Sequence, residues 1–303
     1  MVQTNESIYG KHRAFTSSQQ NLVLPGAKSK YLEAISITIN GLQNGGSVPT
    51  IAAALGLVNP LEIDVGGIPQ IRLRLSDMYA IDMLWLQHNP LTKISAGDDQ
   101  EWIVNQIVYP CWFPPSRAEA TLSATYAAVT NADATEISIT SEYLDGIPRN
   151  EALYYSEFSR NTDGVDSSSF GNWTQTTNLV GNMTGMLFNS TTIPGGSILM
   201  EDGTIQQVRI QGNGNTLLVY EWAEIQNPGI FNGQMFNALE ESPANTSILD
   251  NYRWLSLAKE PIPAGTRVQT DIMAGVNAEA VRTVQMQQVP FRGRELNGSR
   301  ASR

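Results

Sequence analysis

The sequence has few residues of the kinds that build metal centres or covalent cross-links. Among its 303 residues there is one cysteine, Cys111, and there are two histidines, His12 and His88. A single cysteine cannot form an internal disulfide or a thiolate-rich metal site, and two distant histidines leave little for imidazole ligation. Cys111 is expected to be a packed thiol rather than a nucleophile. Enzymes that hold a metal through several histidines in each β-domain are therefore excluded.

Long apolar runs and abundant charge are also missing. No stretch approaches the ~18 consecutive apolar residues of a membrane-spanning helix, and the opening residues lack the apolar core of a secretory signal. Charged residues make up 16% of the chain and hydrophobic residues 41%. Such a chain buries a core, and its many Asn, Gln, Ser and Thr residues favour β-structure with neutral polar outer faces.

The net charge of −10 is unevenly distributed. Residues 1–30 carry +3 and residues 282–303 carry +4, which leaves −17 for the body of the chain. An acidic body repels phosphate, so we expect no sequence-specific binding of nucleic acid. The two basic ends are expected either to meet an anionic surface or to be solvated tails.

An internal repeat is the strongest signal in the sequence. Three blocks recur in the same order: Ile68–Leu73 with Ile205–Ile210, Trp102 with Trp254, and Asn131–Ala134 with Asn277–Ala280. Two more tryptophans, Trp85 and Trp222, align with the first block. The repeat predicts that the two halves of the chain have the same fold.

Most periodic segments alternate apolar and polar residues, which is typical of antiparallel strands with one buried face. They are Ile35–Ile39, Ile71–Leu75, Leu122–Tyr126, Ile137–Thr140 and Val208–Gln211. Arg72 and Arg209 fall on the polar faces, where a solvated or interfacial role is expected. Gly212–Gly214 is expected to be a hairpin turn rather than a phosphate-binding loop. Short helices are predicted at Thr50–Leu57, Asp98–Val108 and Glu151–Ser159, with an inserted amphipathic helix at Gly229–Glu241.

We therefore predict an all-β chain of two tandem eight-stranded jelly rolls with short loop helices. The expected division is an N-terminal arm at 1–30, a first jelly roll at 31–165, a second at 166–290 and a basic C-terminal tail at 291–303. The polar stretch Asn161–Thr177 is either the linker between them or a long loop of the first.

These features resemble the double jelly-roll major capsid proteins of tailless icosahedral, membrane-containing viruses, the lineage of adenovirus and the tectivirus-type phages. In size the chain is similar to the coat proteins of small lipid-containing bacteriophages. The resemblance covers about residues 31–290 and rests on the architecture and the repeat, since the family has no short motif. It implies a non-enzymatic virion subunit, made in the host cytoplasm, whose homotrimers imitate hexagons because three chains of two similar units present six similar edges.

The resemblance also implies partners and contact surfaces. The partners are copies of the chain in the trimer and in neighbouring capsomers, penton or minor capsid proteins, and an internal viral membrane. Termini at the inner face would bring cations to lipid headgroups, at ~1 kcal/mol each: Lys11, Arg13, Lys28, Lys30, Arg292, Arg294, Arg300 and Arg303. Large apolar residues outside the obvious strands are expected in inter-subunit loops, or as caps on the open ends of each sandwich: Trp112, Phe113, Phe231, Met235 and Phe236.

The main alternative is a tandem β-sandwich that binds or cleaves carbohydrate. It predicts a groove lined by Trp112, Trp173 or Tyr252 near paired carboxylates. The pairs are Asp98/Asp99, Glu201/Asp202 and Glu240/Glu241. No cofactor is expected, although calcium in the acidic loop Asp163–Asp166 stays open. A minor spike or vertex protein is a third hypothesis, but a duplicated chain suits a hexagonal lattice better than a fivefold vertex.

Overall fold

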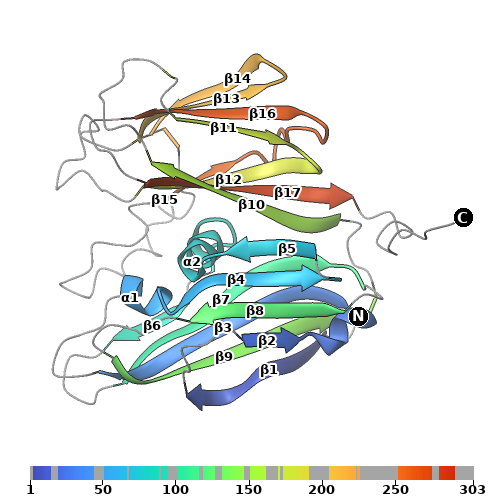
Figure 1. The fold of residues 1–303 in the computed structure, drawn as a ribbon, viewed down its shortest axis with the longest axis vertical. Helices are drawn as coiled ribbons and strands as arrows, with labels where there is room; N and C mark the ends of the chain where they lie inside the picture. Colours follow the sequence, from blue (N-terminus) through green and yellow to red (C-terminus); the bar gives the residue numbers. More distant parts are fainter. Residues whose placement is uncertain are drawn as a thin grey trace, which may run out of the picture. The chain divides into compact units, whose positions relative to one another are not determined.

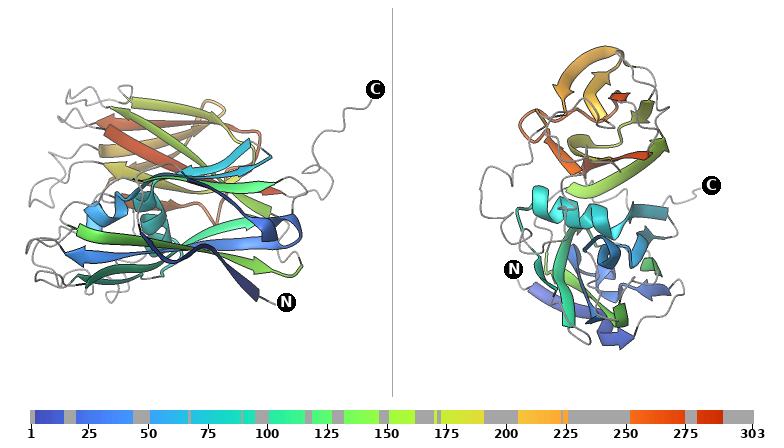
Figure 2. Two further views of the ribbon diagram at one scale, coloured as in Figure 1. Left: turned by 60° about the horizontal axis from the view of Figure 1, so that its bottom comes forward. Right: turned by 90° about the vertical axis from the view of Figure 1, so that its left-hand side faces the viewer.

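A computed structural model of the chain describes residues 3–14, 20–43, 51–66, 68–88, 90–94, 101–115, 119–126, 132–146, 151–161, 170, 173–190, 205–222, 224–225, 252–274 and 280–290. These residues form two compact units, each with two antiparallel sheets packed face to face (Figures 1 and 2). The chain passes from the first unit to the second between Tyr155 and Ser156. None of the described helices has the length and apolarity that crossing a bilayer requires.

The first unit is built from nine strands. One sheet has the order β1 (Gln3–Ala14), β9 (Ala132–Leu144), β3 (Tyr31–Gln43), β7 (Glu101–Phe113) and β6 (Leu91–Ile94). The other has the order β2 (Gln20–Val23), β8 (Ala120–Tyr126), β4 (Val58–Val65) and β5 (Ile68–Leu73). The helix α1 (Ile51–Leu55) precedes β4, α2 (Leu75–Leu84) follows β5, and a 3-10 turn, η1 (Pro25–Lys28), joins β2 to β3.

The second unit is built from eight strands. One sheet has the order β10 (Glu151–Asn161), β17 (Ala280–Pro290), β12 (Asn182–Ser190) and β15 (Tyr252–Ser256). The other has the order β11 (Trp173–Asn178), β16 (Arg267–Ala274), β13 (Ile205–Gly212) and β14 (Asn215–Glu221). The strand β10 belongs to this sheet, although its first half, through Tyr155, lies in the first unit. The predicted boundary at 165/166 falls after β10, whereas the structure divides the chain within it.

The two units have the same topology. Apart from the extra β6, each strand of the first unit has a counterpart at the same place in the second, in the same chain order. This is the jelly-roll arrangement, and the predicted all-β double jelly roll is confirmed. Two blocks of the repeat fall on equivalent strands. Trp102 and Trp254 lie in β7 and β15, and the third block extends to Ala134 in β9 and to Ala280, the first residue of β17.

The sequence alignment matches the first block of the repeat to a neighbouring strand instead of the structurally equivalent one. It pairs β5 with β13, but β5 is an edge strand whose counterpart is β14, and β13 lies one position further in. Both segments have the same apolar–polar alternation, so similarity along the chain cannot distinguish neighbouring strands of one sheet. The repeat was correct as a prediction of shared fold and wrong in this detail.

The structure also changes several local predictions. Residues 3–14 and 20–23 supply two strands of the first sandwich, so most of the predicted N-terminal arm is part of the fold. A helix is present at Ile51–Leu55, but the helices predicted at Asp98–Val108 and Glu151–Ser159 are wrong, since β7 and β10 occupy those positions. Asn213 and Gly214 have positive φ angles of 50° and 85°, which confirms the predicted hairpin turn. The predicted helix at 229–241 lies outside the described residues.

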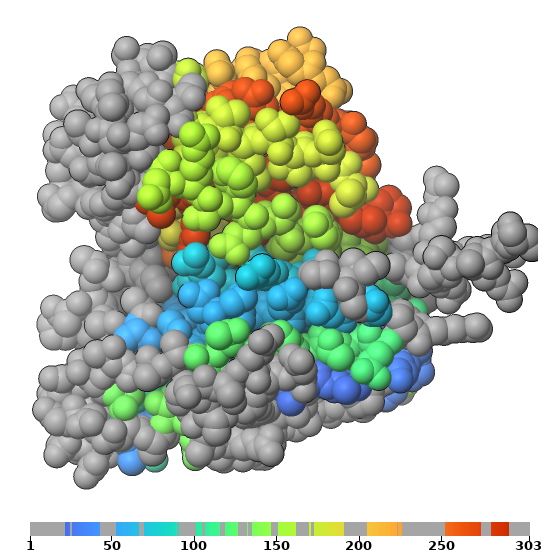
Figure 3. All heavy atoms as spheres, in the orientation of Figure 1, coloured from blue at the N-terminus to red at the C-terminus, as the bar shows by residue number. Residues whose placement is uncertain are grey.

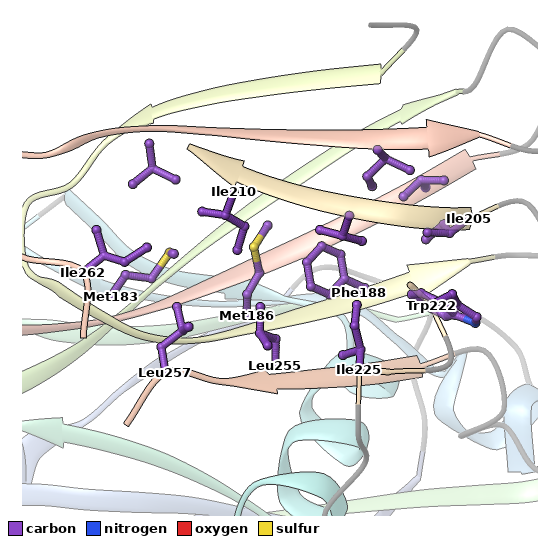
Figure 4. Packing of buried hydrophobic residues seen from close by; sticks show 14 of the residues in the cluster. Met183, Met186, Phe188, Ile205, Ile210, Trp222, Ile225, Leu255, Leu257 and Ile262 are labelled. Atoms are coloured by element: carbon purple, nitrogen blue, oxygen red, sulfur yellow. The ribbon is translucent and has the colours of Figure 1, made fainter. Parts of the chain in front are cut away.

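A tightly packed apolar cluster fills the second sandwich. Met186 and Phe188 on β12 lie between the sheets with Ile210 on β13 (Figure 4). The cluster includes Trp173 and Trp222, and the partly buried Phe158 on β10 packs against it, with its ring centroid 5.3 Å from that of Trp173. Burial of this apolar surface is the main force that holds the two sheets together.

A row of polar side chains interrupts this apolar interior. On β17, Thr283, Gln285 and Gln287 are almost completely buried. The Thr283 hydroxyl donates to Gln175 Oε1 on β11 at 2.6 Å, and Gln287 Oε1 accepts the backbone N–H groups of Val180 and Gly181. Gln285 differs, because neither its amide nitrogen nor its amide oxygen has a partner among the residues that the structure describes.

This difference gives a matched pair of stability predictions. Replacing Gln285→Met should raise the free energy of unfolding by about 1 kcal/mol, because two unpaired buried polar atoms are removed at nearly constant volume. Replacing Thr283→Val should lower it by about 1–3 kcal/mol, because Gln175 Oε1 loses its donor. Urea denaturation of both variants checks the signs, and a destabilised Gln285→Met would contradict the reasoning.

Candidate functional site

A connected polar network lies on the outer face of the β11–β16–β13–β14 sheet. Val208, Ile210 and Ile272 belong to the internal cluster, so their alternating neighbours Arg209 and Asp271 point outward. Arg209 on β13 donates from Nε and Nη2 to Asp271 Oδ2 on β16, at 3.0 and 2.8 Å. The predicted polar-face position of Arg209 is confirmed, and its charge is paired.

Further donors complete the network around Asp271. Its Oδ1 accepts a hydrogen bond from Thr174 Oγ1 on β11 at 2.8 Å and one from Gln269 Nε2 at 2.9 Å. The Phe170 ring lies 4.3 Å from the Arg209 guanidinium, a cation–π contact. Side-chain exposure is 1% for Asp271 and 27% for Arg209. Three strands are therefore held in register by one carboxylate whose oxygens both accept hydrogen bonds.

The edge strand β14 extends this face with apolar side chains. Leu217 and Val219 are 46% and 48% exposed, whereas Leu218 and Tyr220 pack against the internal cluster. Gln207 on β13 hydrogen-bonds the Glu221 carboxylate at the end of β14. Residues 205–222, amber in Figure 3, lie at the surface of the second unit. We call the outward side chains of β11, β13, β14 and β16, together with the exposed Leu217 at the bulge of β14, the Arg209 face.

The basic residues near the N-terminus do not form one group. Lys28 in η1 lies 3.9 Å from the Glu119 carboxylate, and Lys30 directly precedes β3. The start of β3 pairs with Leu144, as does the first residue of β1, whereas Arg13 near the other end of β1 pairs with Ile137. These two partners, Leu144 and Ile137, are seven residues apart along β9, which corresponds to about 25 Å. Lys11 and Arg13 therefore lie far along the sheet from Lys28 and Lys30.

The second unit has a comparable end, built from short turns. The turn between β11 and β12 contains Val180, which is 60% exposed, and Gly181, which packs on the backbone of Gln288 in β17. The strand β17 ends next to this turn, at Pro290. Arg292, Arg294, Arg300 and Arg303 follow in the sequence and lie outside the described residues.

The aromatic segment around Cys111 is not a loop. Residues 109–113 are part of β7, and Phe113 is buried, which makes its assignment to an inter-subunit loop wrong. Trp112 has a φ of 51° at a bulge in β7, and its ring lies 5.8 Å from that of Trp85. The prolines on either side made a bulged strand resemble a loop. Phe231, Met235 and Phe236 lie outside the described residues.

Cys111 is a packed thiol, as predicted. It is fully buried near Tyr109 and Tyr155, whose ring centroids lie 5.1 Å apart. The Tyr155 hydroxyl donates to the Pro110 carbonyl oxygen at 3.2 Å. Burial, with the nearby Glu33 carboxylate, raises the pKa of the Cys111 thiol well above its usual range. Burial also raises the pKa values of Tyr109 and Tyr155. The thiolate form that nucleophilic chemistry requires is therefore strongly disfavoured.

The aromatic groove of the carbohydrate alternative is not formed as predicted. Trp173 is 0% exposed inside the second sandwich, and Tyr252 is 2% exposed. The paired carboxylates and the acidic loop Asp163–Asp166 lie outside the described residues. Within the part of the chain that the structure describes, no three His, Cys, Asp or Glu side chains are grouped as metal ligands.

One buried ionisable pair, Asp82–His88, was missed in the sequence. Asp82 on α2 is fully buried, and its carboxylate lies 2.9 Å from His88 Nδ1 and accepts the Val108 backbone N–H at 2.9 Å. Burial raises the pKa of the Asp82 carboxyl to about 6, although both hydrogen bonds oppose this shift. The pair connects the end of α2 to β7.

Comparison with known proteins gives matches at the level of structure. No protein-family model matches the sequence, and no curated protein matches it. The crystal structure of the STIV MCP has a TM-score of 0.68 at 12% identity and covers 96% of this chain and 97% of that chain. VP54 of PBCV-1, fitted into a reconstruction of the virophage Sputnik, has a TM-score of 0.60 at 12% identity over 95% and 94%. The major capsid protein P2 of bacteriophage PM2 has a TM-score of 0.58 at 10% identity over 97% and 99%.

These similarities extend over nearly the full length of both chains in each comparison. At identities of 10–12% they show the fold, and this chain has the double jelly-roll fold of those proteins. The resemblance drawn from the repeat and the strand pattern is confirmed at that level.

The Asp82 carboxyl predicts a measurable pH dependence of stability. Its folded-state pKa lies above the value of 3.8 expected when unfolded, so between about pH 4 and 6 the folded state binds the proton more tightly. The free energy of unfolding should therefore fall by about 2 kcal/mol as pH rises through this range. In Asp82→Asn, which keeps an acceptor for the Val108 N–H, this fall in the free energy of unfolding should be absent. Denaturation at pH 4.5 and 7 checks this, and equal pH slopes for both proteins would contradict it.

Proposed function

We propose that the chain is the major capsid protein of an icosahedral virus, a structural subunit of the virion shell rather than an enzyme. Two sandwiches of the same strand order, apart from the extra β6, lie in one chain, and this observation carries the proposal. The full-length similarity to capsid proteins of three viruses supports it further. Because the repeat occurs within one polypeptide, each copy brings two similar building blocks to an assembly.

The symmetry of such a chain favours a homotrimer. Three copies present six similar units around a threefold axis, and a ring of this kind packs into a hexagonal lattice. Neighbouring capsomers would then be the main partners, with penton or minor capsid proteins at the fivefold vertices that a hexagonal unit cannot fill. The contacts within such a ring are heterologous, so the two sandwiches need the same outline but not the same surface residues.

The short-turn end of each sandwich is the proposed inner, membrane-proximal surface. In the first unit this end carries Lys28 and Lys30. In the second unit β17 ends here at Pro290, and the basic residues of the C-terminal tail follow in the sequence. Cations near anionic headgroups contribute ~1 kcal/mol each. Lys11 and Arg13 lie about 25 Å away along β1, and we assign them no part in this surface.

Assembly of the purified full-length chain tests the main proposal. Sedimentation velocity should show a species of three times the chain mass, and electron microscopy should show particles of pseudo-hexagonal outline or closed shells. The reason is the threefold arrangement of paired sandwiches described above. A chain that stays monomeric at every concentration and ionic strength would refute a capsid role.

The membrane contact can be tested separately. The full chain should float with vesicles containing anionic lipid, and binding should weaken as salt screens the charges. Lys28→Glu should reduce flotation, and Lys28→Glu with Lys30→Glu should reduce it further. Arg72→Glu on β5, which changes the charge by the same amount as Lys28→Glu alone, should have a smaller effect than that single variant. Equal flotation of all proteins with neutral and anionic vesicles would show that the basic turn end has no such role.

A further inference from the structure

The two edge strands β5 and β14 occupy equivalent places but have different residues. In the first unit, β5 contains Pro69 and the exposed Arg72. Proline and a charged side chain are common means of preventing an edge strand from associating with another protein. In the second unit, β14 has the sequence NTLLVYE, with no proline, lysine or arginine. Its one charged residue, Glu221, is the last residue of the strand. The middle of β14 therefore lacks the protection that β5 has at the same position.

Two of the exposed side chains of β14, Leu217 and Val219, are large and apolar. Val219 is paired with Arg209 and faces outward, and Leu217 lies at a bulge beside Gly212, whereas Leu218 and Tyr220 pack on the core. The strand therefore exposes apolar side chains that the core does not cover. The region around β14 forms an outer edge of the second unit in Figures 1 and 2 and lies at the surface in Figure 3. Covering Leu217 and Val219 would remove apolar surface from water, which favours association.

The surface beside these residues is rigid and already hydrogen-bonded. Arg209, Asp271 and Thr174 hold three strands together, and Phe170 covers the guanidinium. Their mutual contacts mean that a partner can pack against this face without leaving a buried charge unpaired. A surface that is ordered before binding also loses little side-chain entropy on contact.

The charge of this face indicates which partner it suits. The chain as a whole carries −10, so two copies repel each other across most of their surfaces. The charged groups on the Arg209 face are Arg209, Arg267, Asp271 and Glu221, whose charges sum to zero. Asp271 is paired with Arg209, and Glu221 accepts a bond from Gln207. The neutral side chains next to them include Gln211 and Gln269, whose amides both donate and accept hydrogen bonds. A second copy can approach here with little electrostatic cost.

We propose that the Arg209 face, centred on Leu217 and Val219 of β14, is a contact surface for a second copy of this chain. The assignment rests on the proposed capsid role and specifies which part of the second sandwich makes a lateral contact. It also explains why β14 and β5 differ, since only β14 would be covered after assembly.

Surface variants of the full-length chain test this assignment. The first variant is Leu217→Lys with Val219→Lys. A milder variant is Leu217→Thr with Val219→Thr, because threonine is polar but has a high preference for β-strands. Val180→Lys is the matched control, because Val180 is a still more exposed apolar residue of the same unit but lies at its turn end. Circular dichroism and thermal unfolding check folding, and sedimentation velocity measures assembly.

The expected result is loss of the assembled species in both double variants, with the lysine pair more severe, and wild-type assembly in Val180→Lys. Assembly of folded double variants at wild-type concentrations would overturn this assignment and leave the capsid proposal intact. Equal loss in Val180→Lys would also overturn it, because added positive charge alone would then be the cause. A wild-type chain that never assembles would refute both proposals. If the lysine pair does not fold, the threonine pair decides.

Discussion

The position of the last strand in each sandwich is the constraint on which the rest of the structure depends. In the first unit, β9 lies between β1 and β3, and in the second, β17 lies between β10 and β12. The pairing of β12 with β17 joins Met186 to Gln285, almost a hundred residues later in the chain. Once this strand is in place, the order of the remaining strands determines which are central and which are edges. Exposure, and therefore the possible contact surfaces, follows from that order.

Duplication of the chain preserved this framework while the surfaces of the two copies diverged. Equivalent strands carry Pro69 and Arg72 in one unit and Leu217 and Val219 in the other. The interior has also diverged, since the polar row of Thr283, Gln285 and Gln287 lies in the second sandwich. In the threefold ring proposed above, the two kinds of unit would alternate, and each contact would join unlike surfaces. Equal topology with unequal edges is what such a ring requires.

Sequence periodicity predicted most strands and failed where a strand departs from simple alternation. In β7 the buried residues are Trp102 and Val104, then Ile107 and Tyr109, because a bulge inserts one residue between the two pairs. That shift produces a three-residue spacing, which resembles a helix. The strand β10 was misread for another reason: Tyr155 and Phe158 are apolar residues on opposite faces. The helix α2 was missed because it is buried on nearly every side and has no amphipathic stripe.

The candidate surface illustrates the same division. That Arg209 faces outward could be predicted from its alternation with Val208 and Ile210, but its partner Asp271 could not, since 62 residues separate them. The sequence by itself determined the strand periods, the turn positions and the existence of the repeat, because these depend on neighbouring residues and on backbone preferences. Only the tertiary structure decided the strand order, the exposed edge β14 and the grouping of side chains on one face. Antiparallel pairing between distant strands is selected by packing of the whole sandwich, and no short segment encodes it.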